Sequence, residues 1–176
     1  INPLMTMKKI SRLFYLLTAF VVTSTAFSQD ISEKVAQGQH EVQKGNYETA
    51  ISYFNEAVEI DPEYLDAYAK RAFAHSMLQE YEKAISDYTR LIELNPNFVI
   101  AYLSRGSAYN KLERYKEALA DFDKVIILAP SNSEAFNNRG WSKKGLGDKK
   151  GACADWKTSK KMGNEEAKII LKNNQC

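Results

Sequence analysis

Apolar residues recur along most of the chain at the spacing of an amphipathic helix, in paired segments of about fourteen residues. The two segments of a pair meet at a short polar break, such as residues 44–46 or 145–148. A proline follows the second segment of three pairs, where a continuing helix would lose a hydrogen bond and clash with its preceding turn. The pattern therefore predicts an all-α chain of helical hairpins.

The hairpins are copies of one unit. Pro62, Pro96 and Pro130 lie 34 residues apart. Aligned on these prolines, the units are 31–64, 65–98, 99–132 and a less regular one from 133. The eighth place of each unit is glycine or alanine and the twentieth is always alanine, whereas the twenty-fourth is always aromatic: Phe54, Tyr88, Phe122 and Trp156. Small residues let the paired helices approach closely, and stacked neighbours bury the apolar face that one hairpin cannot bury alone.

This pattern resembles the tetratricopeptide repeat, whose 34-residue signature places aromatic, small and proline residues at fixed positions. The third unit matches the signature at Tyr102, Gly106, Tyr109, Ala118, Phe122 and Pro130. The resemblance covers about residues 31–164 and implies a solenoid of stacked antiparallel helix hairpins. It departs from the signature at the seventh place, where three units carry arginine instead of leucine, and at Asn164, which replaces the fourth proline.

The repeats and the segments that flank them give an expected domain organisation. We expect a signal peptide at 1–28, repeats at 29–64, 65–98 and 99–132, a degenerate fourth repeat at 133–163, and a capping helix at 164–176. The cap is expected because the last repeat of a solenoid would otherwise expose an apolar face to water. Ala167, Ile170 and Leu171 would form the buried side of that helix.

The first thirty residues differ from the repeats. A basic start at Lys8 and Lys9 precedes an apolar run at 13–22 and the small residues Ala26 and Ser28, as in a secretory signal peptide cleaved after Ser28. We interpret residues 1–6 as upstream of the true start at Met7. The apolar run is too short to cross a bilayer, which takes roughly 20 residues. We therefore expect export to the periplasm with no membrane span after cleavage; the alternatives are secretion and an uncleaved N-terminal anchor.

Loss of the signal peptide would change the charge balance. The full chain has 24 basic and 22 acidic residues, and removal of Lys8, Lys9 and Arg12 leaves 21 basic against 22 acidic. A near-neutral chain without a basic stripe is poorly suited to the phosphate backbone, so we expect no nucleic-acid partner.

Arginine and aspartate recur with the repeat. The seventh place holds Arg71, Arg105 and Arg139, and the twenty-third holds Asp87, Asp121 and Asp155. In the first unit both are missing together, since Gln37 and Tyr53 stand there. The two places lie at similar distances from the hairpin turn, so the sequence predicts a structural ion pair across each of the three later hairpins.

The sequence has two cysteines, Cys153 and Cys176. If the capping helix folds back on the helix that begins near Lys149, the two thiols come close together, and an oxidising compartment would join them in a disulfide. The alternative is one buried thiol and one thiol at a frayed helix end.

No constellation for chemistry stands out. His40 and His75 are alone in their units, without ligands at metal-binding spacing, and His75 sits at a core place of its helix. Phosphate-binding glycine loops and hydrolase motifs are missing as well. We therefore expect no enzyme activity, no cofactor and no metal.

The resemblance implies instead that the first helix of each hairpin lines a groove for a partner peptide or protein. The residues expected in this groove are Val35, Gln39, Ala69, Phe73, Ile100, Leu103, Asn110, Asn137 and Trp141. Some relatives bind a terminal carboxylate through Lys, Asn and Arg at the fifth and ninth places, and this clamp is missing here. The apolar middle of the groove suits a partner with hydrophobic side chains. The alternative is that Phe73 and Trp141 only pack on adjoining repeats.

The sequence thus predicts a non-enzymatic scaffold for protein–protein interaction in the cell envelope. The alternative is a permanent structural subunit of an envelope assembly or secretion machine.

Overall fold

The computed structural model describes residues 29–176, and this range contains helices and turns but no strand. The expected signal peptide at 1–28 lies outside the described residues. Within 29–176, no helix has the length and apolar character needed to cross a membrane. The described residues divide into two compact units, which separate between Tyr64 and Leu65.

The described part of the first unit is one hairpin. Residues 29–44 form its first helix, and α2 (Tyr47–Ile60) forms its second. Ala50, Phe54 and Ala57 of α2 are fully buried. A side chain at Gly38 would collide with the ring of Phe54, so the glycine is what allows the two helices to lie this close together.

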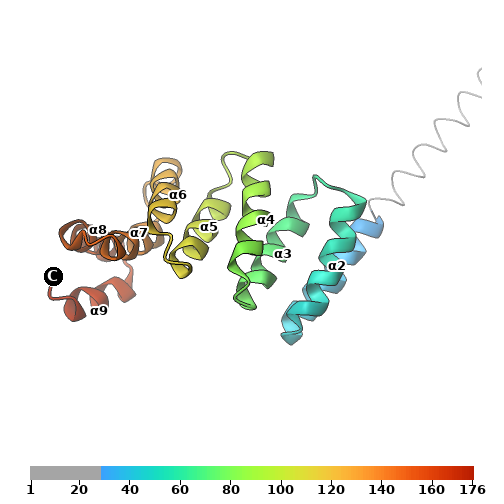
Figure 1. Cartoon of the computed structure of the whole chain (residues 1–176), viewed down its shortest axis with the longest axis horizontal. Coiled ribbons are helices and arrows are strands. Elements are labelled where there is room, and N and C mark those ends of the chain that lie inside the picture. Colours follow the sequence, from blue (N-terminus) through green and yellow to red (C-terminus); the bar gives the residue numbers. More distant parts are fainter. Residues whose placement is uncertain (1–28) are drawn as a thin grey trace, which may run out of the picture. The chain divides into compact units, whose positions relative to one another are not determined.

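The second unit is a stack of helices in chain order (Figure 1). They are α3 (Leu65–Met77), α4 (Tyr81–Leu94), α5 (Val99–Lys111), α6 (Tyr115–Leu128), α7 (Ser133–Gly145), α8 (Lys149–Lys161) and α9 (Glu165–Asn173). Each of these helices packs against the next, and α5 also contacts α7. The predicted all-α solenoid of antiparallel hairpins, ending in a capping helix, is confirmed.

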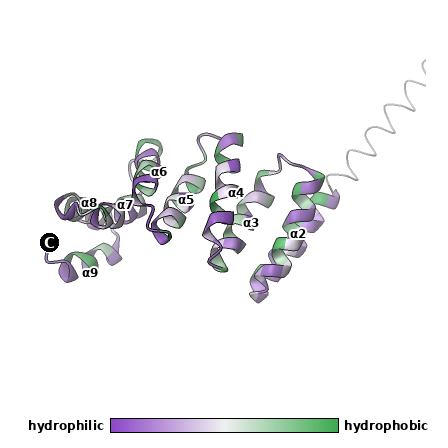
Figure 2. Cartoon of the chain, viewed as in Figure 1, coloured by the Kyte–Doolittle hydropathy of each residue, from purple (hydrophilic) through white to green (hydrophobic). Residues whose placement is uncertain are grey.

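Each hairpin has the same core. The aromatic rings at the twenty-fourth place are buried, with Phe122 at 0% and Trp156 at 1% exposure. A Cβ atom added to Gly106 would lie 2.9 Å from Cε1 of Phe122, and one added to Gly140 would collide with Trp156. Hydrophilic and hydrophobic residues share every helix of the unit (Figure 2), because only one side of each helix faces this core.

Neighbouring hairpins bury one another through a second set of contacts. Tyr102 of α5, Val125 of α6 and Ala135 of α7 form one buried cluster, and Ile92 of α4 packs against it. Four helices from three repeats therefore share one core, which is why no hairpin needs a complete core of its own.

The turn inside each hairpin uses a left-handed residue at the fifteenth place. Its φ is +82° at Gly45, +59° at Gln79, +58° at Glu113 and +85° at Gly147. After α5, for example, the N–H of Glu113 donates to the carbonyl of Asn110 at 3.1 Å and that of Arg114 to Tyr109 at 2.9 Å. These bonds satisfy carbonyls that the helix end would leave unpaired. At two of the four turns, a residue with a side chain occupies a conformation that favours glycine.

The capping helix begins where the other units have proline. The side chain of Asn164 accepts a hydrogen bond from the N–H of Ala167 at 3.1 Å and so caps α9. Ala167 and Ile170 are buried, the latter against Ala152 and Trp156 of α8. The fourth repeat thus replaces a helix breaker with a helix starter.

Glu113→Gly is expected to raise the free energy of unfolding by about 0.5 kcal/mol. The substitution removes about 1 kcal/mol of left-handed strain, partly offset by the greater freedom of glycine in the unfolded chain. Urea denaturation followed by circular dichroism measures the change. The matched control, Ala120→Gly at an exposed interior position of α6, should instead destabilise by about 1 kcal/mol. Equal losses of stability in both variants would contradict this account of the turn.

Candidate functional site

The six charged residues predicted from the repeat meet in three two-pronged pairs. In α3 and α4, Nε of Arg71 donates to Asp87 at 2.9 Å and Nη2 donates to the other oxygen at 2.6 Å. The corresponding distances are 2.9 and 2.8 Å for Arg105 with Asp121, and 2.8 and 2.7 Å for Arg139 with Asp155. The planar guanidinium matches the carboxylate, which makes this the strong form of ion pair.

Arg105 and Arg139 also reach back to the preceding repeat. Nη1 of Arg105 donates to the hydroxyl of Thr89 at 3.0 Å, and Nη1 of Arg139 donates to Asp123 at 2.6 Å. Thr89 and Asp123 occupy the twenty-fifth place of their units. The arginine at the seventh place therefore joins its own two helices to each other and its hairpin to the one before.

Burial makes the central pair sensitive to the loss of either partner. Burial raises the pKa of the Asp121 carboxyl, and the neighbouring Arg105 acts in the opposite direction. Hydrogen bonding to Asp121 raises the pKa of Arg105, which stays cationic. Without Arg105, the Asp121 carboxylate would remain buried with no charge to compensate for its lost hydration.

The first hairpin uses a different pair, which the sequence reading missed. Gln37 and Tyr53 stand where the arginine and aspartate are expected, and Lys34 instead bridges to Glu56 at 2.5 Å. The ammonium of Lys34 also lies 5.9 Å from the centre of the Tyr53 ring. The available signal was Lys34 itself, a charge at the fourth place where the later units have a ring.

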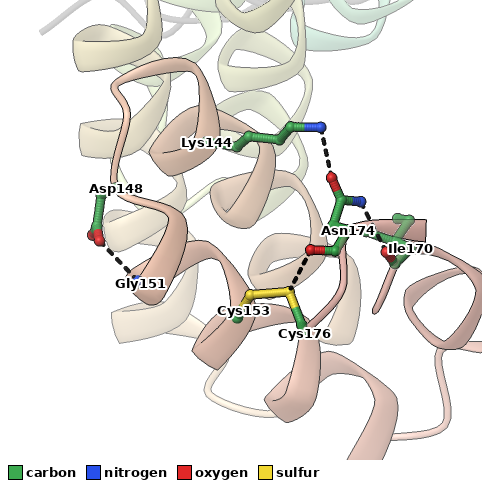
Figure 3. The surroundings of a disulfide bond; sticks show 7 residues. All are labelled: Lys144, Asp148, Gly151, Cys153, Ile170, Asn174 and Cys176. Carbon is green, nitrogen blue, oxygen red and sulfur yellow. Dashed lines mark hydrogen bonds between the residues drawn. A yellow bond between two sulfur atoms is a disulfide. The ribbon is translucent and has the colours of Figure 1, made fainter. Parts of the chain in front are cut away.

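Cys153 and Cys176 form a disulfide with a Cα–Cα distance of 5.6 Å, joining α8 to the segment after α9 (Figure 3). Asn174 lies between the disulfide and α7. Its side-chain oxygen accepts a hydrogen bond from Lys144 at 2.7 Å, and its side-chain nitrogen donates to the carbonyl of Ile170 at 2.8 Å.

The nine residues expected in the groove differ widely in exposure. In the first unit, Val35 is buried and Gln39 is half-buried. In the second unit, Phe73, Ile100 and Trp141 are 46%, 62% and 38% exposed. Ala69, Leu103 and Asn110 are half-buried, and Asn137 is buried.

A pocket of about 580 Å³ lies against the first helices of the last two hairpins. Asn110 of α5, Trp141 and Lys144 of α7, and Glu166 of α9 are among the residues that line it. A second hollow of about 290 Å³, which Met77 and Leu103 help to line, shares Ser107 and Lys111 with the pocket. The two hollows adjoin and run along α3, α5 and α7. We call them together the groove.

The groove has a hydrogen-bonded floor. The amide of Asn110 donates to the carbonyl of Asn138 at 3.1 Å and accepts from the hydroxyl of Ser142 at 2.8 Å. The amide of Asn138 in turn reaches the hydroxyl of Ser107 at 3.4 Å. These bonds join α5 to α7 along the pocket.

Trp141 is held from within its own hairpin. Its ring meets that of Trp156 edge to face, with centroids 5.3 Å apart and planes at 66°. The ammonium of Lys144 lies 4.9 Å from the centre of the Trp141 ring. Since Trp141 still lines the pocket and is 38% exposed, it both packs on its neighbour and offers indole surface to the groove.

Asn137 lies beneath the capping helix. It is 2% exposed, and its amide donates to Glu166 of α9 at 3.1 Å. Its backbone carbonyl accepts from the indole N–H of Trp156 at 3.1 Å, while its side-chain oxygen has no hydrogen-bond partner. A partner would reach this amide only if Glu166 moved.

Sequence reasoning missed several pocket residues, namely Lys111, Tyr115, Asn138, Gly145 and Glu166. Three of them sit at the sixth or thirteenth place of a unit, directly after a place that the resemblance picks out, whereas Tyr115 begins α6 and Glu166 comes from the cap. Only the packing of α5, α7 and α9 reveals which of these side chains face the groove.

His75 makes a contact that joins the two helices of its hairpin. His75 is 8% exposed, and its Nδ1 lies 2.6 Å from a carboxylate oxygen of Glu80 across the hairpin turn. In residues 29–176, no group of three His, Cys, Asp or Glu residues is placed to hold a metal ion.

Comparison with known protein families identifies the repeats. The family described as tetratricopeptide repeat matches residues 99–132, and the family described as TPR repeat matches residues 38–79 and 77–113. Together these matches cover more than half of the chain. No curated protein sequence matches the chain significantly.

Solved structures share the fold. A crystal structure of MamA has 23% sequence identity and a TM-score of 0.73, over 86% of this chain and 88% of that one. The first TPR of Spaghetti (RPAP3), bound to the HSP90 peptide SRMEEVD, has 29% identity and a TM-score of 0.65, over 68% of this chain and 95% of that one. The second TPR domain of human RPAP3, in complex with the HSP70 peptide SGPTIEEVD, has 29% identity and a TM-score of 0.64, over 66% of this chain and 98% of that one.

Arg105→Met is expected to lower the free energy of unfolding by about 3 kcal/mol, because it leaves the buried Asp121 carboxylate unpaired. The double variant Arg105→Met/Asp121→Leu should recover much of this loss, since it removes the uncompensated charge as well. Arg114→Met is the matched control. Arg114 is 40% exposed and pairs with Glu117 on the surface, so its loss should cost less than about 1 kcal/mol. Chemical denaturation that ranks Arg105→Met level with Arg114→Met would refute the assignment.

Proposed function

Because the chain belongs to the tetratricopeptide repeat family, we propose that it is a non-enzymatic scaffold that binds a segment of a partner protein in the groove. The observation that carries the proposal is the pocket itself. It is a preformed hollow of about 580 Å³ with a hydrogen-bonded floor and a half-exposed tryptophan in its wall. Tetratricopeptide repeats are in general interaction folds, and the two RPAP3 domains were solved with peptides bound.

The groove favours a partner that contributes an apolar or aromatic side chain. Rigid, half-exposed aromatic residues in a preformed pocket are typical anchors of binding energy. Trp141 supplies such an anchor, and Met77, at 47% exposure, extends the apolar surface into the second hollow. The peptides in the RPAP3 structures end in EEVD. We propose a different partner chemistry here, because the fifth and ninth places carry residues such as Leu103 and Phe73 instead of a set of cations.

We propose that this scaffold works in the periplasm. A disulfide is stable in an oxidising compartment, and the Cys153–Cys176 bond is compatible with export. The basic and apolar segments of residues 1–28 have the composition of a signal peptide. Mass measurement of the exported protein tests this part, since cleavage after Ser28 leaves a chain that begins at Gln29.

Placing a photo-crosslinking phenylalanine analogue at position 141 should capture the partner in intact cells. The same analogue at Ile127 is the control, because Ile127 is a large apolar residue, 73% exposed, on α6 and away from the groove. We expect one dominant adduct from position 141 and none of the same mass from position 127. Adducts of equal yield from both positions would rule out the groove as the binding surface.

Once captured, the partner allows affinity to be measured. Trp141→Ser is expected to weaken binding at least about 30-fold, which is the loss of a binding hot spot, while the helical circular dichroism signal stays unchanged. Phe73→Ser tests whether the contact extends beyond the two hollows, since Phe73 is 46% exposed and lines neither of them. Ile127→Ser controls for the loss of an exposed apolar side chain and should bind normally.

A further inference from the structure

The capping helix is too short to hold itself in place. α9 has nine residues, and helices shorter than about 12 residues are marginal in water without tertiary contacts. Its buried side chains are Ala167 and Ile170, and it packs mainly against α8. The position of α9 therefore depends on a small apolar contact and on the bonds that fasten its two ends.

Hydrogen bonds near both ends of α9 reach α7, the helix that carries Trp141 and Lys144 of the pocket. Near the start of α9, Glu166 lines the pocket and accepts a hydrogen bond from the side-chain amide of Asn137. After its end, Asn174 accepts a hydrogen bond from the ammonium group of Lys144. Two residues later, Cys176 forms the disulfide to Cys153 (Figure 3). The disulfide is the one covalent member of this set, and it confines the segment that presents Asn174 to Lys144.

The surroundings of the disulfide suit thiol exchange. Cys153 and Cys176 are half-buried and line a hollow of about 170 Å³ together with Lys144 and Lys149. This hollow has no acidic residue in its lining. Nearby ammonium groups favour the thiolate form of a cysteine, and a sulfur that leaves as a stabilised thiolate is displaced more readily.

We propose that the Cys153–Cys176 disulfide is a redox site at which a dithiol reductant releases α9 and thereby reshapes the pocket. One thiolate of the reductant attacks a sulfur of the disulfide, forms a mixed disulfide and releases the other cysteine as a thiolate. The second thiol of the reductant then displaces the first sulfur. The protein gains two electrons and two protons as two thiols, and the reductant leaves as a disulfide.

Release of α9 has defined consequences for the pocket. Glu166 withdraws its carboxylate from the wall, Asn137 loses the acceptor of its amide, and Lys144 loses its bond to Asn174. Trp156, which is 1% exposed beneath Ile170 and Leu171, becomes accessible to water. That these changes control partner binding rests on the proposed function. The release of α9 itself is measured without a partner.

Hydrogen exchange of the full chain, read by mass spectrometry with and without dithiothreitol, tests the proposal. Thiol alkylation before the measurement verifies that both cysteines are reduced. We expect amides of 165–176 to lose protection at least about tenfold on reduction, while those of α3 to α6 keep theirs. Persistent protection of α9 in the alkylated protein would overturn the proposal, and so would loss of protection along the whole chain.

A second measurement reports on the core beneath α9. Trp141→Phe leaves Trp156 as the only tryptophan, since the sequence has two. Acrylamide quenching of its fluorescence should rise at least about twofold on reduction. In the matched control, Trp141→Phe with both Cys153→Ser and Cys176→Ser, quenching should be high from the start and indifferent to dithiothreitol. A response to the reductant in this cysteine-free control would overturn the assignment to the disulfide.

The two proposals fail in different ways. If the groove binds no partner, crosslinking from positions 141 and 127 is equal, while hydrogen exchange still responds to the reductant. If reduction of the disulfide does not release α9, hydrogen exchange is unchanged, while position 141 still crosslinks to the partner.

Discussion

The structure depends on one contact in each hairpin. An aromatic ring on the second helix packs against a small residue on the first. At Gly106 and Phe122, and again at Gly140 and Trp156, even one added methyl group would collide with the ring. The ring therefore packs directly on the backbone of the opposite helix, and the hairpin closes to a fixed separation. The ion pairs within hairpins and the contacts between hairpins depend on this separation, because it sets where the helices lie.

The ion pairs are the first consequence of this close approach. The seventh and twenty-third places come within hydrogen-bond reach in three successive hairpins, two with glycine and one with alanine at the eighth place. A buried pair of this kind adds little net stability, since the desolvation of both charges offsets their attraction. Its geometry is demanding, however, and a slip of one residue along either helix would separate the guanidinium from the carboxylate. The extra N–H of Arg105 and Arg139 extends that requirement to the preceding repeat.

The last repeat shows how a regular stack acquires an individual site. Trp156 replaces the smaller rings of the earlier units, and its ring packs edge to face with that of Trp141 at the wall of the pocket. Asn164 replaces proline and starts another helix, whose Glu166 and following Asn174 complete the surroundings of the pocket. The disulfide and one side of the pocket thus lie where the repeat departs from its own pattern. Regular positions maintain the stack, and irregular ones help to shape the surface that we propose binds a partner.

The amino-acid sequence by itself determined the all-α class, the hairpin period and the charged partners within each of the three later hairpins. These properties follow from spacing along one chain, since Arg105 and Asp121 stand at equal distances from a turn and the ring at Phe122 recurs at a fixed interval. Only the tertiary structure decided which surface residues belong to the pocket. Asn137 and Trp141 are one helical turn apart on α7, yet α9 covers the first and leaves the second half-exposed. The cause is physical: exposure and hydrogen-bond reach between repeats depend on the packing of α5, α7 and α9, which no local spacing specifies.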